Sequence, residues 1–270
     1  MKILKNNNDL NEALKNESNL GFVPTMGSLH QGHISLIKSS QKKCKKTIIS
    51  IFVNPTQFNK KNDYNNYPRT LKKDLILLKK LKVNFVYIPQ KKHVYNFKRK
   101  KMIKLSNRDK ILCAKFRKNH FEGVLDVMDR LTNQIKPKNI FMGEKDFQQL
   151  TLVKKFLEKK FNVKVISCKT VRDVNNIALS SRNVLLKKKE LRIAGLIINK
   201  IISLKKMFKN QKNINIFLEN KKSSIEKKYN IKIEYLELRD KINLKKTNKI
   251  KNSKLFIAYY LKKIRLIDNV

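Results

Sequence analysis

Short apolar runs alternate with stretches of helical spacing over the first 170 residues of the chain. Runs rich in β-branched residues indicate strands at 20–25, 47–53, 83–88, 139–142 and 162–167. Between them, apolar residues recur at helical spacing in 9–18, 34–43, 71–81, 124–135 and 150–157. Strands that alternate with helices predict a parallel sheet with right-handed crossovers.

The pattern changes after about residue 170. Helical stretches at 188–209 and 214–228 precede strand-like runs at 232–238, 255–261 and 265–267. Segment 91–108 is basic and irregular, and the polar segment 241–254 predicts a surface loop. We therefore expect an α/β fold with a Rossmann-like parallel sheet and helices on both faces in 1–170. A smaller C-terminal, lid-like α+β domain should follow in 171–270.

The segment PTMGSLHQGH, residues 24–33, joins the first of these long strands to a helix. Its two glycines permit a tight turn, and unpaired N–H groups at a helix N-terminus attract anions. His30 and His33 lie on one face of the first helical turn, where both can reach one phosphate. The alternative is a pair of helix-capping or metal-binding histidines, although no third ligand lies nearby in the sequence. The segment predicts a nucleotide site.

Two further polar segments, 54–58 and 143–149, also follow predicted strands. The carboxyl ends of parallel strands share one edge of the sheet, and ligands bind there near the reversal of strand order. We therefore expect the three segments to converge on one cleft. Lys145, between Gly143 and Asp146, would supply a point charge for phosphate oxygens.

The composition is strongly basic, with 64 Lys and Arg against 20 Asp and Glu and a net charge of +44. Such a charge is typical of proteins that bind nucleic acid or membrane surfaces. Here, however, lysine is scattered through every segment together with abundant asparagine and isoleucine, which indicates a bias of the whole chain. We therefore predict no nucleic-acid partner and no membrane partner.

Cysteine usage and hydropathy bear on the compartment. Cys44, Cys113 and Cys168 are far apart and form no CxxC pair, which predicts buried, reduced thiols rather than disulfides or a zinc site. The longest apolar runs are too short to span a bilayer, and the N-terminus has no signal-peptide core. We expect a soluble, cytoplasmic protein.

Six motifs together resemble the pantothenate synthetases, also called pantoate–β-alanine ligases, of the HxGH-type nucleotidyltransferases. In order they are PTMGSLHQGH (24–33), SIFVNPTQF (50–58), YPRT (67–70), GEKDFQQL (143–150), ALSSRN (178–183) and RLIDN (265–269). The resemblance covers essentially the whole chain. It implies an AMP-forming ligase that condenses (R)-pantoate with β-alanine through a pantoyl adenylate, in pantothenate and coenzyme A biosynthesis.

The resemblance also implies the site residues. Catalysis would involve His33, His30, Lys145 and Arg182, because fixed cationic donors stabilise the charge that develops on the phosphates. Pantoate and β-alanine would be bound by Gln57, Gln149 and Asn54. The ATP site would comprise Met26, Gly27, Ser28, Leu29, His30, Gln31, Gly32, His33, Gly143, Glu144, Lys145, Asp146, Val171, Leu179, Ser180, Ser181 and Arg182. ATP would be the co-substrate, with Mg²⁺ as cofactor.

Some positions depart from the family pattern. Asn119 and Asn176 stand where relatives carry glycine, and asparagine is the residue best able to share a left-handed backbone. Lys72 and Lys73 precede Asp74 where relatives often carry acids that support Mg²⁺ binding. Asp74 is therefore the one candidate metal ligand, and ATP phosphates would hold most of the ion.

Other interpretations stay open at this point. A related enzyme such as a cytidylyltransferase would also carry HxGH, although NPTQF and GEKDFQQ argue against it. The charge alone motivates a nucleic-acid-binding protein. Ser180, Ser181 and Arg182 could be a plain helix N-cap, which is compatible with phosphate binding. A homodimer through the first domain is implied by the resemblance only.

Overall fold

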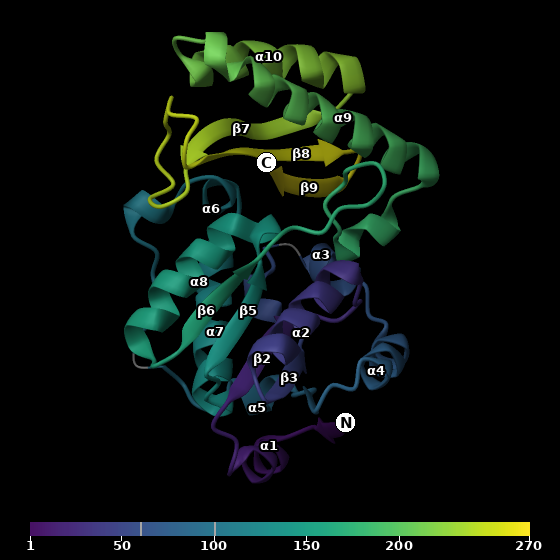
Figure 1. Ribbon diagram of the computed structural model, residues 1–270, viewed down its shortest axis with the longest axis vertical. Coiled ribbons are helices and arrows are strands. Elements are labelled where there is room, and N and C mark those ends of the chain that lie inside the picture. Colours follow the sequence, from purple (N-terminus) through teal and green to yellow (C-terminus); the bar gives the residue numbers. More distant parts are fainter. Residues whose placement is uncertain (60, 100) are drawn as a thin grey trace. The chain divides into compact units, whose positions relative to one another are not determined.

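The computed structural model describes residues 1–59, 61–99 and 101–270, and the chain divides into two compact units (Figure 1). Unit 1 comprises Met1–Glu144 and Gln149–Lys169, whereas unit 2 comprises Lys145–Gln148 and Thr170–Val270. The division after Lys169 lies next to the boundary expected after residue 170, which stays a prediction. The four residues Lys145–Gln148, which we expected in the first domain, belong to unit 2.

Unit 1 is built on a six-stranded parallel sheet in the order β1-β4-β3-β2-β5-β6. The strands are β1 (Lys2–Leu4), β2 (Leu20–Thr25), β3 (Lys46–Ile51), β4 (Phe85–Tyr87), β5 (Asn139–Gly143) and β6 (Lys164–Cys168). The chain runs from β2 outward through β3 to β4, and later from β5 to β6 on the other side. The carboxyl ends of β2 and β5 therefore flank the switch in strand order, where ligands bind in such sheets.

Helices cover both faces of this sheet, as the sequence predicts (Figure 1). On one face, Val23, Ile49 and Val86 pack in one buried cluster with residues of α2 (Gln31–Lys43) and α4 (Leu71–Lys80). On the other, the Tyr87 hydroxyl donates a 2.7 Å hydrogen bond to Asn7 of α1 (Asn7–Leu14). The remaining helices of this part of the chain are α3 (Lys61–Asn65), α5 (Lys91–Val94), α6 (Cys113–Phe116), α7 (His120–Ile135), α8 (Phe147–Lys160) and the 3₁₀ helices η1 (Pro55–Gln57), η2 (Asn107–Asp109) and η3 (Glu144–Asp146).

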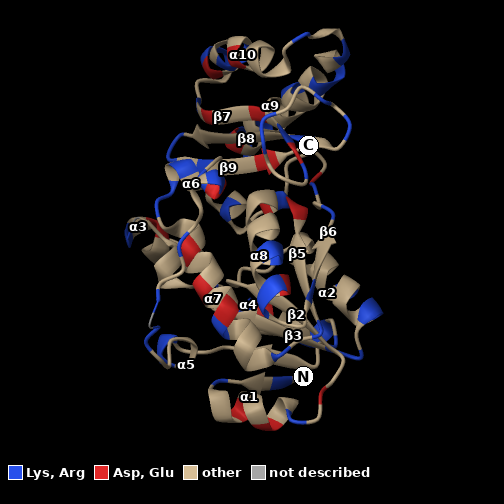
Figure 2. Cartoon of the chain, turned by 90° about the vertical axis from the view of Figure 1, so that its left-hand side faces the viewer, with Lys and Arg blue, Asp and Glu red and all other residues tan. Residues whose placement is uncertain are grey.

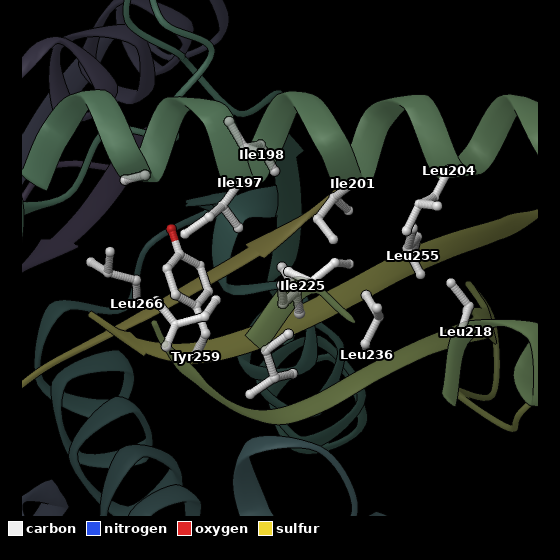
Figure 3. Packing of buried hydrophobic residues seen from close by; sticks show 14 of the residues in the cluster. Ile197, Ile198, Ile201, Leu204, Leu218, Ile225, Leu236, Leu255, Tyr259 and Leu266 are labelled. Carbon is white, nitrogen blue, oxygen red and sulfur yellow. The ribbon is translucent and has the colours of Figure 1, made fainter. Parts of the chain in front are cut away.

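Unit 2 contains an antiparallel sheet in the order β7-β8-β9. Its elements are η4 (Ser181–Leu185), α9 (Lys188–Lys206), η5 (Met207–Asn210), α10 (Ile214–Tyr229), β7 (Lys232–Asp240), β8 (Ser253–Leu261) and β9 (Ile264–Asn269). Ile197, Ile201 and Leu204 of α9 pack over the sheet residues Leu255 and Tyr259 (Figure 3). This is the predicted α+β domain, with a core of its own.

Local chemistry explains the helix ends that the hydrophobic pattern misplaced. The first helix spans Asn7–Leu14 rather than 9–18. It begins at Asn7 because the Asn6 side chain caps it by accepting the Asp9 N–H at 2.9 Å. The helix predicted over 188–209 ends at Lys206 and continues as a 3₁₀ turn. Strand β1 was missed because its three residues are too few to show a period.

The basic residues are distributed along the whole chain, as the composition indicates. Lysine and arginine are spread over the elements of both units, while acids gather on α7 (Figure 2). In the described part of the chain no helix is long and apolar enough to cross a membrane. Cys44, Cys113 and Cys168 are buried and none is in a disulfide, as predicted.

Candidate active site

The loop between β2 and α2 makes a tight turn through two left-handed residues. Gly27 has φ +81° and Ser28 has φ +53°. The Thr25 hydroxyl donates to the Ser50 carbonyl oxygen at 2.7 Å and accepts the Gly27 N–H at 3.2 Å, so the loop is tied to the neighbouring strand β3. This turn returns the chain at once to the edge of the sheet, where α2 begins.

His30 and His33 form a reciprocal cap at the start of α2. His30 Nδ1 accepts the Gly32 N–H at 3.1 Å, and His33 Nδ1 accepts the His30 N–H at 3.2 Å. A ring nitrogen that accepts a hydrogen bond carries no proton, so the neutral rings are protonated at Nε2. The ring centroids are 4.1 Å apart. Capping by Nδ1 thus places a matched pair of Nε2–H donors at a helix N-terminus, and the capping and phosphate-binding interpretations are compatible.

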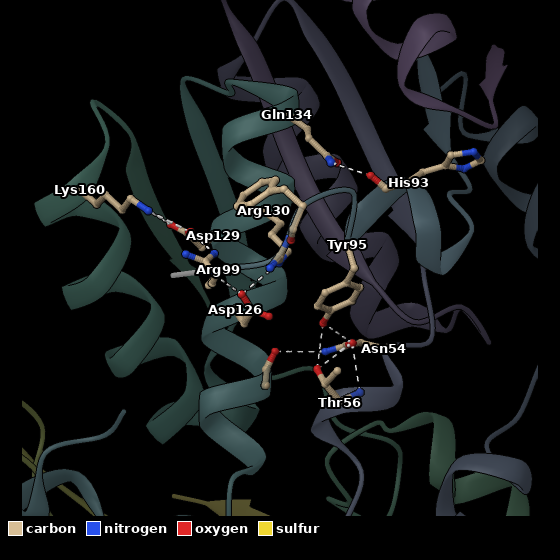
Figure 4. Close-up of polar contacts among 12 residues, drawn as sticks. Asn54, Thr56, His93, Tyr95, Arg99, Asp126, Asp129, Arg130, Gln134 and Lys160 are labelled. Carbon is tan, nitrogen blue, oxygen red and sulfur yellow. Dashed lines mark hydrogen bonds and ion pairs between the residues drawn. The ribbon is translucent and has the colours of Figure 1, made fainter. Parts of the chain in front are cut away.

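Asn54 and Gln57 come from the loop after β3 and from η1. Asn54 is 1 % exposed, and its Oδ1 accepts hydrogen bonds from Thr56 and from the Tyr95 hydroxyl, the latter at 2.8 Å (Figure 4). Its Nδ2 donates to Gln57 Oε1 at 3.2 Å and to the Gly123 carbonyl at 3.1 Å. The amide of Asn54 is therefore used up within the protein. In the structure Asn54 orients Gln57, and a direct contact of Asn54 with substrate stays a prediction.

Gln57 keeps capacity for a ligand. Its Nε2 donates to Met26 Sδ at 2.9 Å, which joins the loops after β2 and β3. One amide hydrogen and one carbonyl lone pair of Gln57 remain beyond these two contacts. Burial raises the pKa of the neighbouring Tyr95, so its hydroxyl stays protonated and donates to Asn54.

Arg117 and His120 support Gln57 from behind. His120 Nδ1 lies 2.6 Å from the Gln57 carbonyl oxygen, and Arg117 Nη1 lies 2.8 Å from His120 Nε2. A guanidinium can only donate, so Nε2 accepts and Nδ1–H donates to Gln57. Neither residue was assigned a role from the sequence, because the sequence does not show that His120 meets the backbone carbonyl of Gln57.

An ionic network attaches the segment around Arg99 to α7. Arg99 contacts Asp126 and Asp129, Arg130 pairs with Asp126 at 3.1 Å, and Lys160 of α8 pairs with Asp129 at 2.7 Å (Figure 4). Arg130 also lies over the Tyr95 ring at 4.7 Å. The two acids of α7, Asp126 and Asp129, therefore link this helix to Arg99 and Lys160.

Within unit 2, Lys145 and Asp146 form a weak ion pair at 3.7 Å, with side chains 17 % and 47 % exposed. The carbonyl oxygen of Lys145 accepts a 2.9 Å hydrogen bond from Asn269 Nδ2 at the end of β9. The RLIDN motif, which had no assigned role, thus anchors the backbone of the predicted phosphate-binding lysine.

The segment that carries Ser180, Ser181 and Arg182 is closed at its base. Arg172 forms a bidentate pair with Asp268 at 2.7 and 2.9 Å, and Leu179 N–H donates to the Val171 carbonyl at 3.0 Å. Ser180 accepts the Arg182 N–H at 3.3 Å as the cap of η4. Asn176 has φ +67°, and Asn119 at the start of α7 has φ +59°, so both predicted left-handed asparagines are confirmed.

The structure gathers the predicted residues in two sets, one in each unit. Unit 1 holds the 26–33 loop, Asn54, Gln57, Gly143, Glu144 and Gln149, and unit 2 holds Lys145, Asp146, Val171, Leu179, Ser180, Ser181 and Arg182. Within unit 1, the Glu144 carboxylate accepts the Ser167 hydroxyl at 2.8 Å. Sequence reasoning assigned no individual role to six residues that contact these segments, namely Tyr95, Arg117, His120, Arg172, Asp268 and Asn269.

The metal expectation finds little support. In the described residues no group of three or more His, Cys, Asp and Glu could hold a metal ion. Asp74, the one candidate ligand, accepts the backbone N–H groups of Ser28 and Leu29, each at 2.9 Å. Its carboxylate faces hydrogen-bond donors, which is the wrong surrounding for a cation. The side chains present do not fit a protein-held Mg²⁺.

The sheet is parallel, and the HQGH sequence caps α2, the helix that follows the switch-point strand β2. This combination defines an HxGH-type nucleotidyltransferase. The family model for pantoate–β-alanine ligase matches residues 2–270. The chain belongs to the pantoate–β-alanine ligase family, whose members are ligases that form an amide bond.

Individual relatives agree. Pantothenate synthetase of Clostridium botulinum is 41% identical over 254 residues, covering 93% of this chain and 90% of the relative. That of Azobacteroides pseudotrichonymphae is 39% identical, covering 100% and 99%. The crystal structure of the Thermus thermophilus pantothenate synthetase superposes with a TM-score of 0.92 at 28% identity, covering 100% of this chain and 99% of that one. The Francisella tularensis ligase, crystallised with β,γ-ATP and β-alanine, has a TM-score of 0.85 at 35% identity, covering 100% and 97%.

Proposed function

We propose that this chain condenses (R)-pantoate with β-alanine at the expense of ATP, through a pantoyl adenylate, and releases pyrophosphate and AMP. The observation that carries the proposal is the paired cap at the start of α2. It directs two imidazole Nε2–H donors to the N-terminal end of a helix that follows the switch-point strand β2.

The reaction has two group transfers. A carboxylate oxygen of pantoate attacks the α-phosphorus of ATP, the bond to the β-phosphate oxygen breaks, and pyrophosphate leaves. The amine of β-alanine then attacks the acyl carbonyl carbon, the bond to AMP breaks, and the nitrogen loses a proton. Negative charge builds on the phosphates in the first step, so preorganised donors supply most of the rate enhancement.

The residues divide between these demands. His30, His33, Lys145 and Arg182 donate to the phosphate oxygens, and Asp146 holds the ribose. Gln57 and Gln149 bind pantoate, with Asn54 holding Gln57 in place through its 3.2 Å hydrogen bond. Because no described cluster fits a protein-held cation, any Mg²⁺ would be held mainly by the phosphates of ATP, where it would neutralise part of their charge.

The decisive experiment is exchange of labelled pyrophosphate into ATP by the purified protein. Exchange should need pantoate, and pantothenate should form only when β-alanine is added. Formation of ADP and phosphate would refute the adenylate route. CTP in place of ATP tests the cytidylyltransferase alternative, which predicts exchange with CTP.

Variants test the phosphate donors. Lys145→Ala should lower turnover roughly 10²- to 10³-fold, as does loss of one preorganised donor in other enzymes. The matched control is Lys154→Ala, which removes an exposed charge from α8 and should leave turnover unchanged. Equal turnover in the two variants would contradict the assigned role of Lys145. We also propose a cytoplasmic location, on the cysteine usage and the short apolar runs, and a homodimer, on the family resemblance alone; light scattering tests the dimer.

A further inference from the structure

Asp74, in the first turn of α4, is a buried acid, and each of its partners among the described residues donates a hydrogen bond to it. Its side chain is 2 % exposed. Oδ2 accepts the Ser28 N–H at 2.9 Å, and Oδ1 accepts the Leu29 N–H at 2.9 Å and the Thr70 hydroxyl at 3.1 Å. Among the described residues it has no ion-pair partner. The charge is balanced instead by these donors and by the N-terminal end of α4.

The donors come from the strained turn before the histidines. Gly27 and Ser28 both have positive φ, and the next two backbone N–H groups, those of Ser28 and Leu29, point toward the same carboxylate. Successive N–H groups that converge in a turn form an anion-binding nest. A serine in this conformation costs roughly 1–2 kcal/mol, so something must hold it there. In this chain the anion in the nest is the Asp74 carboxylate.

Two consequences follow for the nucleotide site. The N–H groups of Ser28 and Leu29 are bound by Asp74, so the loop's contact with phosphate has to come from other groups. Leu29 also precedes His30 directly, and the His30 N–H is the donor that fixes His33 Nδ1 at 3.2 Å. A shift of the turn therefore moves the paired cap.

We propose that Asp74 is a positioning residue: it locks the turn before α2 and so aims the Nε2–H donors of His30 and His33. This assigns Asp74 to the loop rather than to a metal ion. The role in catalysis rests on the proposed function, whereas the control of histidine geometry does not.

The first test is nuclear magnetic resonance of the imidazoles without substrate. The chain has four histidines, so the signals of His30 and His33 can be compared with those of His93 and His120 in the same spectrum. Asp74→Asn keeps the shape of the side chain but replaces one acceptor oxygen with an NH₂ group, which cannot accept the backbone N–H that faces it. It should shift the ring signals of His30 and His33 and leave those of His93 and His120 in place. Unshifted signals in a folded variant would overturn the proposal, whatever the enzyme's activity.

The second test separates a loop clamp from a metal ligand. In pyrophosphate exchange, Asp74→Asn should raise the KM for ATP roughly ten- to a hundredfold, the effect of losing a hydrogen bond to a charged group. The Mg²⁺ concentration for half-maximal activity should not change. A variant whose lost activity returns with added Mg²⁺ would identify a metal ligand instead.

Two further variants control for stability. Asp240→Asn removes a carboxylate that accepts the Ile242 and Asn243 N–H groups at 2.8 and 3.0 Å in a turn without predicted site residues. It should leave the KM for ATP and the histidine signals unchanged. If Asp74→Asn does not fold, Thr70→Val replaces it, because this change removes only the hydroxyl donor to Asp74. The ring signals of His30 and His33 should then shift by a smaller amount. Unshifted signals in Thr70→Val would overturn the proposal.

Discussion

Gly123 in α7 lies where a side chain would strike the backbone of η1. A Cβ built there would lie 2.5 Å from the Thr56 carbonyl oxygen and 3.0 Å from the Gln57 nitrogen, whereas ordinary contact begins at 3.4 Å. Thr56 presents backbone atoms, which cannot rotate aside, so Gly123→Ala must move η1 by about 1 Å.

The magnitudes show which effect dominates. Alanine in a helix interior gains about 1 kcal/mol over glycine, while overpacking costs about 1–3 kcal/mol. Stability should therefore fall by about 2 kcal/mol at most. Function should suffer more, because the shift carries Gln57 and strains the hydrogen bond from Asn54 to the Gly123 carbonyl, now 3.1 Å. A displacement of about 1 Å at a positioning group can cost on the order of 10²-fold in rate.

The assay is pantoate dependence of pyrophosphate exchange, with urea unfolding in parallel. Gly123→Ala should lower kcat/KM for pantoate on the order of 10²-fold, with little change in the KM for ATP. The control is Gly21→Ala in β2, whose Cβ would meet Ser40 Oγ at 2.1 Å and Cys44 Sγ at 3.0 Å, away from the predicted site residues. It should lose stability but keep its kinetic constants. Wild-type kcat/KM for pantoate in Gly123→Ala would refute the reasoning.

Gly143→Ala should leave stability unchanged, since its Cβ would meet no heavy atom within 4 Å, yet raise the KM for ATP about tenfold by filling the predicted path of the nucleotide. Equal KM values for mutant and wild type would place the nucleotide elsewhere. Glu190 caps α9, and the hydrogen bonds from Lys262 and then the Lys187 N–H lower its pKa. A carboxylate with a lowered folded pKa stabilises the protein above the unfolded value near about 4.3 and loses this as pH falls. The gap in urea midpoint between wild type and Glu190→Gln should therefore shrink on acidification; a constant gap would contradict the shift.

Features that depend on neighbouring residues could be predicted from the sequence. The strand–turn–helix around HQGH follows from an apolar run, two glycines and a helical stripe that lie next to each other. The left-handed conformations of Asn119 and Asn176 likewise follow from the residue type at a position where the chain must turn. Edge strand β1 was too short to show a pattern.

Most supporting contacts within each unit depend on the tertiary structure. Asp74 is 46 residues from Ser28 along the chain, Tyr95 is 41 from Asn54, and Asn269 is 124 from Lys145. A hydrophobic period records which face of an element is buried, but not which distant backbone group will meet a given side chain. The sequence alone therefore predicts which residues bind phosphate and substrate. Only the packing of the strands and helices decided that Asp74 accepts the N–H groups of Ser28 and Leu29 and that Asn54 holds Gln57.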